Sequence, residues 1–499
     1  MSIILSTLNA RYTHASLGLR YLFANLGDLQ EQARILEFVI GVNTSEIVER
    51  LLERRPRIIG FGVYIWNVAE TTRVVAMLRR LAPEITIVLG GPEVSYESEE
   101  QAIFAQADYV ITGWGETSLP PLCRQILSGD PSARPAAKIQ AGIQAPLDSL
   151  ALPYAFYTDR DIARRTLYVE ASRGCPFKCE FCLSALDKTA WPFDLDLFLG
   201  EMQALHARGA RRFKFVDRTF NLSIPSSLRI LRFLLDKLMA NPDDPVFAHF
   251  EMVPDHLPQP LRDIIVRFPA GALQFEIGVQ SWNPDVQALV SRRQDNDKAA
   301  DNIRWLRENT NVHLHVDLIA GLPGEDMASF ARGFDRLQAL GPQEIQLGVL
   351  KRLRGAPIVR HTAGFDMVFD PNPPYSVLAT DRIDFHDMQR LKRFARYWDL
   401  VANSGRFAAT LPVLLGDTPF DNFMAWSDWL YSTAGATSGI SLDRLARLVT
   451  QWLQSRGIAR ETADALLAGD YAGQAPHRRP SRQIGLAQPS RQAKHRAKS

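Results

Sequence analysis

The stretch TLYVEASRGCPFKCEFC (residues 166–182) joins a short apolar run to three closely spaced cysteines, and the rest of the chain can be organised around it. The spacing of Cys175, Cys179 and Cys182 is C-x3-C-x2-C. Three thiolates on one tight loop can hold three corners of a cubane iron–sulfur cluster, because soft sulfur ligands suit iron. A tetrahedral zinc site needs a fourth ligand, and the remaining cysteine, Cys123, falls in an apolar helical pattern far upstream, where we expect it to be buried. The stretch therefore predicts a strand followed by a cluster with one iron open to a small molecule.

Strand and helix patterns continue from this stretch to residue 355. Each strand pattern is a short apolar run, and helical periodicity separates one run from the next. Six such units favour a partial, open (β/α)6 barrel over residues 166–355, with its chemistry at the carboxyl ends of the strands. The expected strands are Thr166–Ser172, Arg212–Val216, Val246–Glu251, Gln274–Val279, His313–Ile319 and Glu344–Val349.

Residues 1–130 show a similar alternation and predict an α/β domain with a doubly wound parallel sheet of five strands. Ligands of such sheets bind beyond the carboxyl ends of the strands. Two glycine-rich segments, Gly90-Gly91-Pro92 and Gly113-Trp114-Gly115-Glu116, lie there. Glycine lets the backbone approach a bulky ligand closely, although on spacing alone a simple turn is the favoured explanation of the first segment. The expected strands are Ile3–Ser6, Arg34–Val39, Ile58–Tyr64, Ile85–Leu89 and Tyr109–Thr112.

The remaining segments differ from these two in composition. Residues 131–165 begin with a Pro-, Ala-, Gly- and Gln-rich stretch and are expected to be a linker, whereas residues 356–470 predict a mostly helical domain. The last 29 residues, 471–499, hold seven Lys or Arg and no Asp or Glu, which predicts a disordered basic tail. We favour a solubilising extension over a nucleic-acid-binding arm, because no aromatic residue interleaves its charges.

The overall composition is that of a chain with sizeable buried cores. The 499 residues are 46% apolar and 22% charged with a net charge of +2, which excludes a wholly disordered or collagen-like polymer. No apolar run is long enough for a membrane-spanning helix, and the first residues lack the pattern of a signal peptide. We therefore expect a cytoplasmic protein that spans no membrane. Four cysteines in a chain of this length provide no disulfide framework.

The cysteine loop, with Phe181 before its last cysteine, resembles the signature of radical S-adenosylmethionine (SAM) enzymes. The resemblance implies a [4Fe-4S] cluster held by Cys175, Cys179 and Cys182, with SAM chelating the free iron. It also implies reductive cleavage of SAM to methionine and a 5′-deoxyadenosyl radical, with the electron coming from an external donor of the flavodoxin or ferredoxin type.

Three later segments strengthen the resemblance in order along the barrel. Phe215–Asn221 ends the second strand, where the superfamily contacts the SAM amino group, although the residues differ from its usual Gly-Gly-Glu-like turn. Gly278–Asn283 with Arg292 is similar to the coproporphyrinogen-dehydrogenase-like branch, in which the arginine would pair with the SAM carboxylate. Asp317–Glu325 resembles the segment that packs on adenine. Singly, each could be an ordinary strand end. Together they imply SAM contacts from Phe181, Asp217, Thr219, Glu251, Gln280, Ser281, Arg292, Asp317 and Gly321.

The N-terminal domain resembles the cobalamin-binding domain of cobalamin-dependent radical SAM enzymes, and the region beyond residue 350 resembles an uncharacterised C-terminal domain of one branch of these proteins. The usual D-x-H-x-x-G motif that ligates cobalt from below is absent. His14, in its place, is expected to hydrogen-bond locally instead of binding cobalt. The resemblance implies cobalamin contacts from Tyr64, Trp66, Asn67, Gly90, Gly91, Pro92, Gly113, Gly115 and Glu116.

Together these resemblances imply methylation of an unactivated carbon, with SAM and cobalamin meeting at the mouth of the barrel. The substrate, a small molecule or natural product, is not encoded in any motif. Two alternatives stay open: a radical rearrangement or ring contraction that uses cobalamin without methyl transfer, and a non-catalytic cobalamin- or cluster-binding sensor. Nucleic acid is not the favoured partner.

Overall fold

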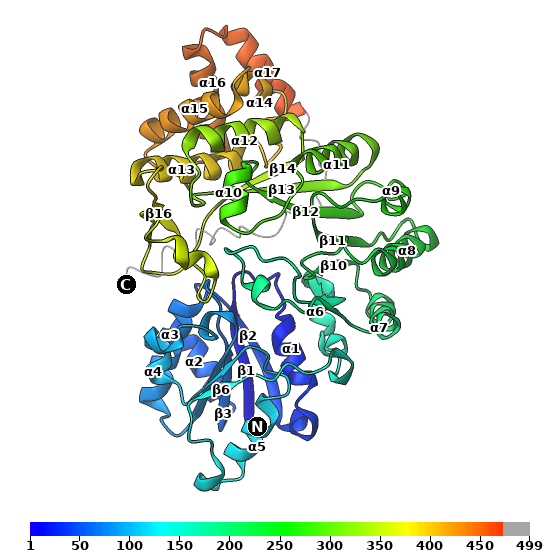
Figure 1. The fold of residues 1–499 in the computed structure, drawn as a ribbon, viewed down its shortest axis with the longest axis vertical. Helices are drawn as coiled ribbons and strands as arrows, with labels where there is room; N and C mark the ends of the chain where they lie inside the picture. Colours follow the sequence, from blue (N-terminus) through cyan, green and yellow to red (C-terminus); the bar gives the residue numbers. More distant parts are fainter. Residues whose placement is uncertain (473–499) are drawn as a thin grey trace.

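The computed structural model describes residues 1–472, and its N-terminal part is a parallel sheet covered by helices on both faces (Figure 1). The strand order is β2-β1-β3-β4-β5-β6, and every pair of neighbours is parallel. The strands are β1 (Ile3–Asn9), β2 (Ala33–Val39), β3 (Ile58–Gly62), β4 (Thr86–Gly90), β5 (Tyr109–Thr112) and β6 (Ile139–Ala141).

Apolar residues on both faces of this sheet explain its two helical layers. One buried cluster joins the sheet to α1 (Leu17–Ala24) and α5 (Leu119–Leu127), where the Cys123 side chain is fully buried, as expected. The other cluster joins it to α2 (Thr44–Leu52), α3 (Val68–Leu81) and α4 (Ala102–Gln106). Parallel strands buried on both faces carry near-continuous apolar runs, which is the pattern that the sequence shows.

A sixth strand, β6, corrects the expected count of five. It pairs with β5 from within the stretch that the composition suggested was a linker. This edge strand is short, and its residues stay exposed or half-buried, so no apolar run marks it. The same stretch also contains the short helix α6 (Asp159–Arg164).

The middle of the chain forms the expected open half-barrel, a six-stranded parallel sheet in the order β14-β13-β12-β11-β10-β7. Its strands are β7 (Leu167–Val169), β10 (Arg212–Phe215), β11 (Phe247–Met252), β12 (Leu273–Gln280), β13 (His313–Ala320) and β14 (Glu344–Val349). The short pair β8 (Ser172–Arg173) and β9 (Trp191–Pro192) brackets the cysteine loop. The helices are α7 (Leu195–Ala207), α8 (Ile224–Ala240), α9 (Gln259–Ile265), α10 (Pro284–Leu289), α11 (Asn296–Asn309) and α12 (Met327–Ala339).

The C-terminal part is mostly helical, and its helices pack on the β14 side of the barrel, far from the N-terminal sheet (Figure 1). Phe334 of α12 contacts Phe394 and Phe420 of the C-terminal helices edge-on. The elements are the hairpin β15 (Val368–Phe369) and β16 (Val377–Ala379), and the helices α13 (Phe385–Val401), α14 (Leu411–Leu415), α15 (Pro419–Ala434), α16 (Leu442–Ser455) and α17 (Arg460–Ala472). The basic tail that the sequence predicts falls, apart from its first two residues, outside the described residues.

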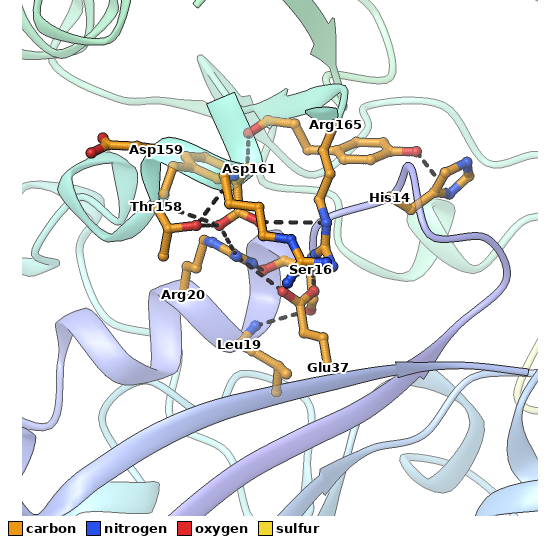
Figure 2. Close-up of polar contacts among 12 residues, drawn as sticks. His14, Ser16, Leu19, Arg20, Glu37, Thr158, Asp159, Asp161 and Arg165 are labelled. Atoms are coloured by element: carbon orange, nitrogen blue, oxygen red, sulfur yellow. Dashed lines mark hydrogen bonds and ion pairs between the residues drawn. The ribbon is translucent and has the colours of Figure 1, made fainter. Parts of the chain in front are cut away.

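A buried ion network connects the N-terminal sheet and α1 to the segment around α6, which precedes the first barrel strand (Figure 2). Arg20 of α1 contacts Glu37 of β2 at 3.0 Å and Asp161 of α6 at 2.9 Å. Arg165, just after α6, contacts the same Glu37 at 2.9 Å. All four side chains are nearly or fully buried, so the two parts meet through paired charges and not through a loose tether.

Candidate functional site

The three motif cysteines line one cavity of about 850 Å³ at the carboxyl ends of the barrel strands. Cys175 and Cys179 are buried and Cys182 is half-buried, and none of them forms a disulfide. The loop before them turns at Gly174, which has φ +95° and whose Cβ would lie 2.7 Å from the Ala190 nitrogen. Only glycine fits this turn, and the backbone of Cys175 is then fixed by donating to the Asp187 carbonyl at 2.8 Å.

These thiols fit an iron–sulfur cluster. Burial raises the pKa values of Cys175 and Cys179, the latter against the opposing effect of Arg292, so these side chains need a bound metal to hold them as thiolates. Within residues 1–472, no three His, Cys, Asp or Glu side chains converge on one point as the ligands of a single ion would. A cubane spreads its irons over separate corners, so three thiols spaced around a cavity suit it.

Most of the residues expected to contact SAM line this same cavity. Glu251 is the penultimate residue of β11 and pairs at 2.9 Å with Arg218, which follows β10. The Arg292 Nη1 lies 3.6 Å from the Cys179 sulfur, and its Nη2 donates to the Gly278 carbonyl. The expected residues that the structure brings to the cavity are Phe181, Thr219, Glu251, Gln280, Arg292 and Asp317.

Three other expected SAM contacts do not line the cavity. The buried Asp217 carboxylate accepts hydrogen bonds from the Ala171 N–H at 3.0 Å and the Ser172 hydroxyl at 2.6 Å. The buried Ser281 hydroxyl donates to Glu325 at 2.7 Å. Gly321 packs against the C-terminal part, where its Cβ would lie 2.5 Å from Val377. Local hydrogen bonding and packing engage all three positions.

Sequence reasoning missed Glu276 on the cavity floor. Its carboxylate contacts His249 at 2.9 Å and Lys214 at 3.4 Å, and these contacts, against the opposing effect of burial, hold its pKa below the usual range. Glu276, Gly278 and Gln280 alternate along β12 and all line the cavity. This two-residue period could have revealed Glu276 from the sequence, because side chains alternate between the two faces of a strand and Glu276 therefore shares a face with Gly278 and Gln280.

A second cavity, of about 1240 Å³, opens at the carboxyl ends of the N-terminal strands. Glycines and apolar side chains form most of its lining, and Gly113, with φ +71°, has nothing within 4 Å of its Cβ position, so it faces open space. Gly91 has φ +106°, and its Cβ would lie 2.5 Å from the Val63 carbonyl oxygen. Such walls suit a bulky planar ligand such as a corrin. The expected cobalamin contacts that line this cavity are Tyr64, Gly90, Gly91, Pro92, Gly113, Gly115 and Glu116.

Trp66, Asn67 and His14 do not line this cavity. Trp66 is 48% exposed and stacks on Tyr64 with ring centroids 4.4 Å apart. The fully buried Asn67 amide donates to the carbonyls of Leu8 and Gly62, which fixes the start of α3. His14 hydrogen-bonds Tyr168 of the barrel strand β7 through Nδ1 at 3.1 Å (Figure 2), so its side-chain partner lies 154 residues away and is not the local one that the sequence suggested.

Arg173 connects the two cavities. It lies two residues before Cys175, yet its side chain lines the second cavity and contacts Glu116 at 2.8 Å and Glu170 at 3.0 Å. The guanidinium also lies over the Trp114 ring, 4.5 Å from its centroid. The residue that enters the cysteine loop is therefore part of the wall of the second cavity.

Comparisons with protein families match three parts of the chain. The B12 binding domain matches residues 4–122, the Radical SAM superfamily matches residues 169–337, and a family described as Protein of unknown function (DUF4080) matches residues 363–497. The first two matches contain most of the lining of the second and first cavities, respectively. They imply cobalamin, and a [4Fe-4S] cluster with SAM.

Two relatives are methyltransferases. The chain is 25% identical over 331 residues to the 2-(S-pantetheinyl)-carbapenam-3-carboxylate methyltransferase of Streptantibioticus cattleyicolor. It is 24% identical over 351 residues to the cobalamin-dependent radical SAM methyltransferase TokK of Streptomyces tokunonensis. The alignments cover 58% and 61% of this chain but 46% and 48% of those proteins, so the chain spans about half the length of these curated relatives.

Solved structures share the fold. The cobalamin-dependent SAM radical enzyme OxsB, with aqua-cobalamin bound, superposes with a TM-score of 0.62 at 13% identity, over 95% of this chain and 80% of that chain. The methyltransferase TsrM from Kitasatospora setae, with cobalamin and a [4Fe-4S] cluster bound, gives 0.55 at 19% identity, over 73% of this chain and 75% of that chain. At these identities the likeness establishes the shared fold alone. None of the described helices is long and apolar enough to cross a membrane.

Proposed function

The chain belongs to the cobalamin-dependent radical SAM family, and from this premise we propose that it is an enzyme that methylates an unactivated carbon of a small molecule. When bound, the reduced cluster supplies the electron that cleaves SAM, and cobalamin supplies the methyl group. The observation that carries the proposal is the position of Arg173, because it makes the cluster loop part of the wall of the cobalamin cavity.

The residues of the first cavity would hold and orient the cluster and SAM. Cys175, Cys179 and Cys182 would bind three irons. The Arg292 guanidinium would form a charge-assisted contact with the SAM carboxylate. Glu251, held by Arg218, leaves a carboxylate on the cavity wall for the amino or ribose groups of SAM.

The residues of the second cavity would hold cobalamin mainly through shape. The glycine backbone at residues 90–91 and 113–115 leaves room for the macrocycle, and the ring of Tyr64 forms part of the wall. Fixed placement of the reactants would lower the entropic part of the barrier.

The substrate class and the partner are further parts of the proposal. The methyltransferase activity named for both relatives supports a natural-product or other small-molecule substrate. All four cysteines are free, and a cluster that must be reduced for each SAM cleavage suits a reducing compartment. We therefore place the enzyme in the cytoplasm with an external electron donor of the flavodoxin or ferredoxin type.

The test is anaerobic reconstitution of the full chain with iron, sulfide and hydroxocobalamin, followed by product analysis with SAM and a reductant. Methyl transfer requires both 5′-deoxyadenosine and S-adenosylhomocysteine. Formation of 5′-deoxyadenosine alone would instead support a radical rearrangement. Binding of both cofactors without any SAM cleavage would overturn the enzyme assignment and support a sensor.

A further inference from the structure

A closed loop crosses from the end of the barrel to the cobalamin cavity. It comprises residues 351–376, between β14 and β16, and we call it the strap. Its two ends are tied together: the Arg352 N–H donates to the Tyr375 carbonyl at 3.0 Å, and the Val377 N–H donates to the Leu350 carbonyl at 2.8 Å. The family of unknown function matches the chain from residue 363, so the strap joins that region to the barrel.

One side of the strap hydrogen-bonds to the loop that follows Gly90-Gly91-Pro92 in the cobalamin cavity. Glu93 directly follows Gly90-Gly91-Pro92, and its side chain is buried. The Tyr375 hydroxyl donates to the Glu93 carboxylate at 2.7 Å, and the Arg354 Nε donates to the same oxygen at 3.2 Å. Both donors come from the strap, from positions 21 residues apart in sequence.

A second contact on the same side is made by the strap backbone. The Gly355 N–H donates to the Glu97 carboxylate at 3.3 Å, and Arg352 contacts Glu97 at 3.0 Å. A Cβ on Gly355 would lie 2.3 Å from the Tyr96 ring, so the strap lies directly on this aromatic side chain. Tyr375 itself has φ +53°, an uncommon conformation that persists only where surrounding contacts hold it.

The other side of the strap contacts the cluster loop, the segment that carries Cys175, Cys179 and Cys182. Glu180, between Cys179 and Phe181, is buried, and its backbone carbonyl accepts a hydrogen bond from the Ile358 N–H at 2.9 Å. Its carboxylate contacts the His361 Nε2 at 2.9 Å and pairs with Arg360. The strap is therefore attached to one loop of each cofactor cavity.

These contacts matter energetically because both gripped carboxylates are buried. A buried carboxylate that loses its donors keeps its desolvation penalty without compensation. The loop carrying Glu93 or Glu180 would then have to move until water or another donor reached the carboxylate. For Glu93 that movement would shift Gly91 and Pro92, which line the cobalamin cavity.

We propose that the strap holds the cobalamin loop and the cluster loop in fixed relative positions, and that Arg354 and Tyr375 are positioning residues for cobalamin. Neither residue lines the cavity, so both would act through Glu93. The proposal rests on cobalamin being the occupant of the second cavity, which the titration of the unaltered protein tests separately.

The experiment is an anaerobic titration of the full, cluster-loaded chain with hydroxocobalamin, followed by absorbance. Outer partners that orient metal ligands typically contribute about 10- to 100-fold to metal affinity, and we take the lower end for this site because Glu93 itself does not line the cavity. We therefore expect Arg354→Gln to weaken cobalamin binding by about tenfold and Tyr375→Phe by about threefold, with iron content unchanged. Arg354→Lys should restore part of the loss, because it keeps the charge but not the planar fork.

A double-mutant comparison distinguishes action through Glu93 from general destabilisation. If Arg354 acts through Glu93, combining Arg354→Gln with Glu93→Gln should weaken binding no more than the worse single change. The matched control is Arg124→Gln, which breaks an exposed pair with Asp28 and should leave the affinity unchanged. If Arg354→Gln fails to fold, Tyr375→Phe tests the proposal instead, because it deletes only one hydroxyl.

The far end of the strap supplies the sharpest test. His361→Gln lies against the cluster loop and not against the cobalamin cavity, yet it should weaken cobalamin binding by about twofold or more. Unchanged cobalamin affinity in this variant, or in Tyr375→Phe, would overturn the strap proposal. Absence of cobalamin binding by the unaltered protein would instead overturn the family-based cofactor assignment.

Discussion

The two cavities described above differ in the kind of group that lines them. The cavity around the cysteines is lined by many charged side chains, including Arg218, Glu251, Glu276 and Arg292. The cavity of the N-terminal part is lined mainly by glycine backbone and apolar side chains, with Glu116, Glu170 and Arg173 as its charged residues.

The difference follows the chemistry of the two ligands. SAM is small and carries an amino group, a carboxylate and a sulfonium, so point charges can hold and orient it. A corrin is a broad macrocycle, so a site for it must first provide room, which missing side chains supply. One cavity should therefore be sensitive to changes of charge and the other to changes of volume.

The largest effect is expected from Cys179→Ala. Removal of one of three thiolate ligands should abolish the visible absorbance of the cluster and lower SAM cleavage by about a hundredfold or more. Cys123→Ala is the matched control: this buried thiol lies in α5, so the cluster should survive. Retained SAM cleavage in Cys179→Ala would refute the cluster assignment.

Arg173→Gln should affect both cavities. The side chains of Arg173, Glu116 and Glu170 are 14%, 9% and 11% exposed, so the change leaves two buried carboxylates without their cation. Loss of one partner from such a group costs about 3 kcal/mol of folding stability. We expect lower iron content and weaker hydroxocobalamin binding together, with partial recovery in Arg173→Lys. A loss confined to one cofactor would show that Arg173 does not join the cavities.

Gly91→Ala tests whether added side-chain volume disturbs the cobalamin cavity. The added Cβ would lie 2.5 Å from the Val63 carbonyl oxygen, at a φ that favours glycine, so we expect a loss of about 2 to 3 kcal/mol and of cobalamin binding. Gly129→Ala is the control for strain alone, because Gly129 also has a positive φ of +79°, does not line the cavity and has no protein atom within 4 Å of its Cβ position, and it should cost about 1 kcal/mol. The cluster should form in both variants. Similar losses in the two variants would contradict the steric explanation.

The smallest effect is expected from Asp217→Asn, behind the cluster cavity. Burial raises the pKa of Asp217 from 3.8 to about 7, with hydrogen bonds from Ser172 and Ala171 opposing the shift. The folded protein then binds the proton more tightly than the unfolded chain, so this residue makes stability fall as pH rises from about 4 to about 7. The amide cannot ionise, so the variant should be more stable than the unaltered protein at pH 8 and equal to it near pH 4. Chemical denaturation at both pH values measures this, and a pH-independent difference would contradict it.

The fold could be predicted wherever a strand is buried. All six barrel strands and five strands of the N-terminal sheet bury apolar residues, and the ends of each lie within three residues of the expected ends. The strand β6 could not be predicted, because an exposed edge strand needs no apolar residues. The strap could not be predicted either, since its contacts join residues about 180 to 280 positions apart in the sequence.

The candidate site was partly predictable for a similar reason. Motif spacing was enough for Cys175, Cys179 and Cys182, which line one cavity as expected. Residue type and position along the motif were not enough to predict the environment of Asp217 and Ser281. A polar residue at a strand end can also hydrogen-bond to neighbouring backbone and side-chain groups, as both of these residues do. Glu276 was overlooked because its role depends on partners from two other strands.

The ion network between α1 and α6 has a practical consequence for dissecting the molecule. An N-terminal fragment that ends at residue 130 would lack Asp161 and Arg165, leaving Glu37 with one of its two cations and Arg20 without Asp161. Such a piece would also lack β6 and leave the edge of β5 open to self-association. A fragment made to study the cobalamin-binding part by itself should therefore extend through residue 165, so that it includes Arg165, the last residue of the ion network.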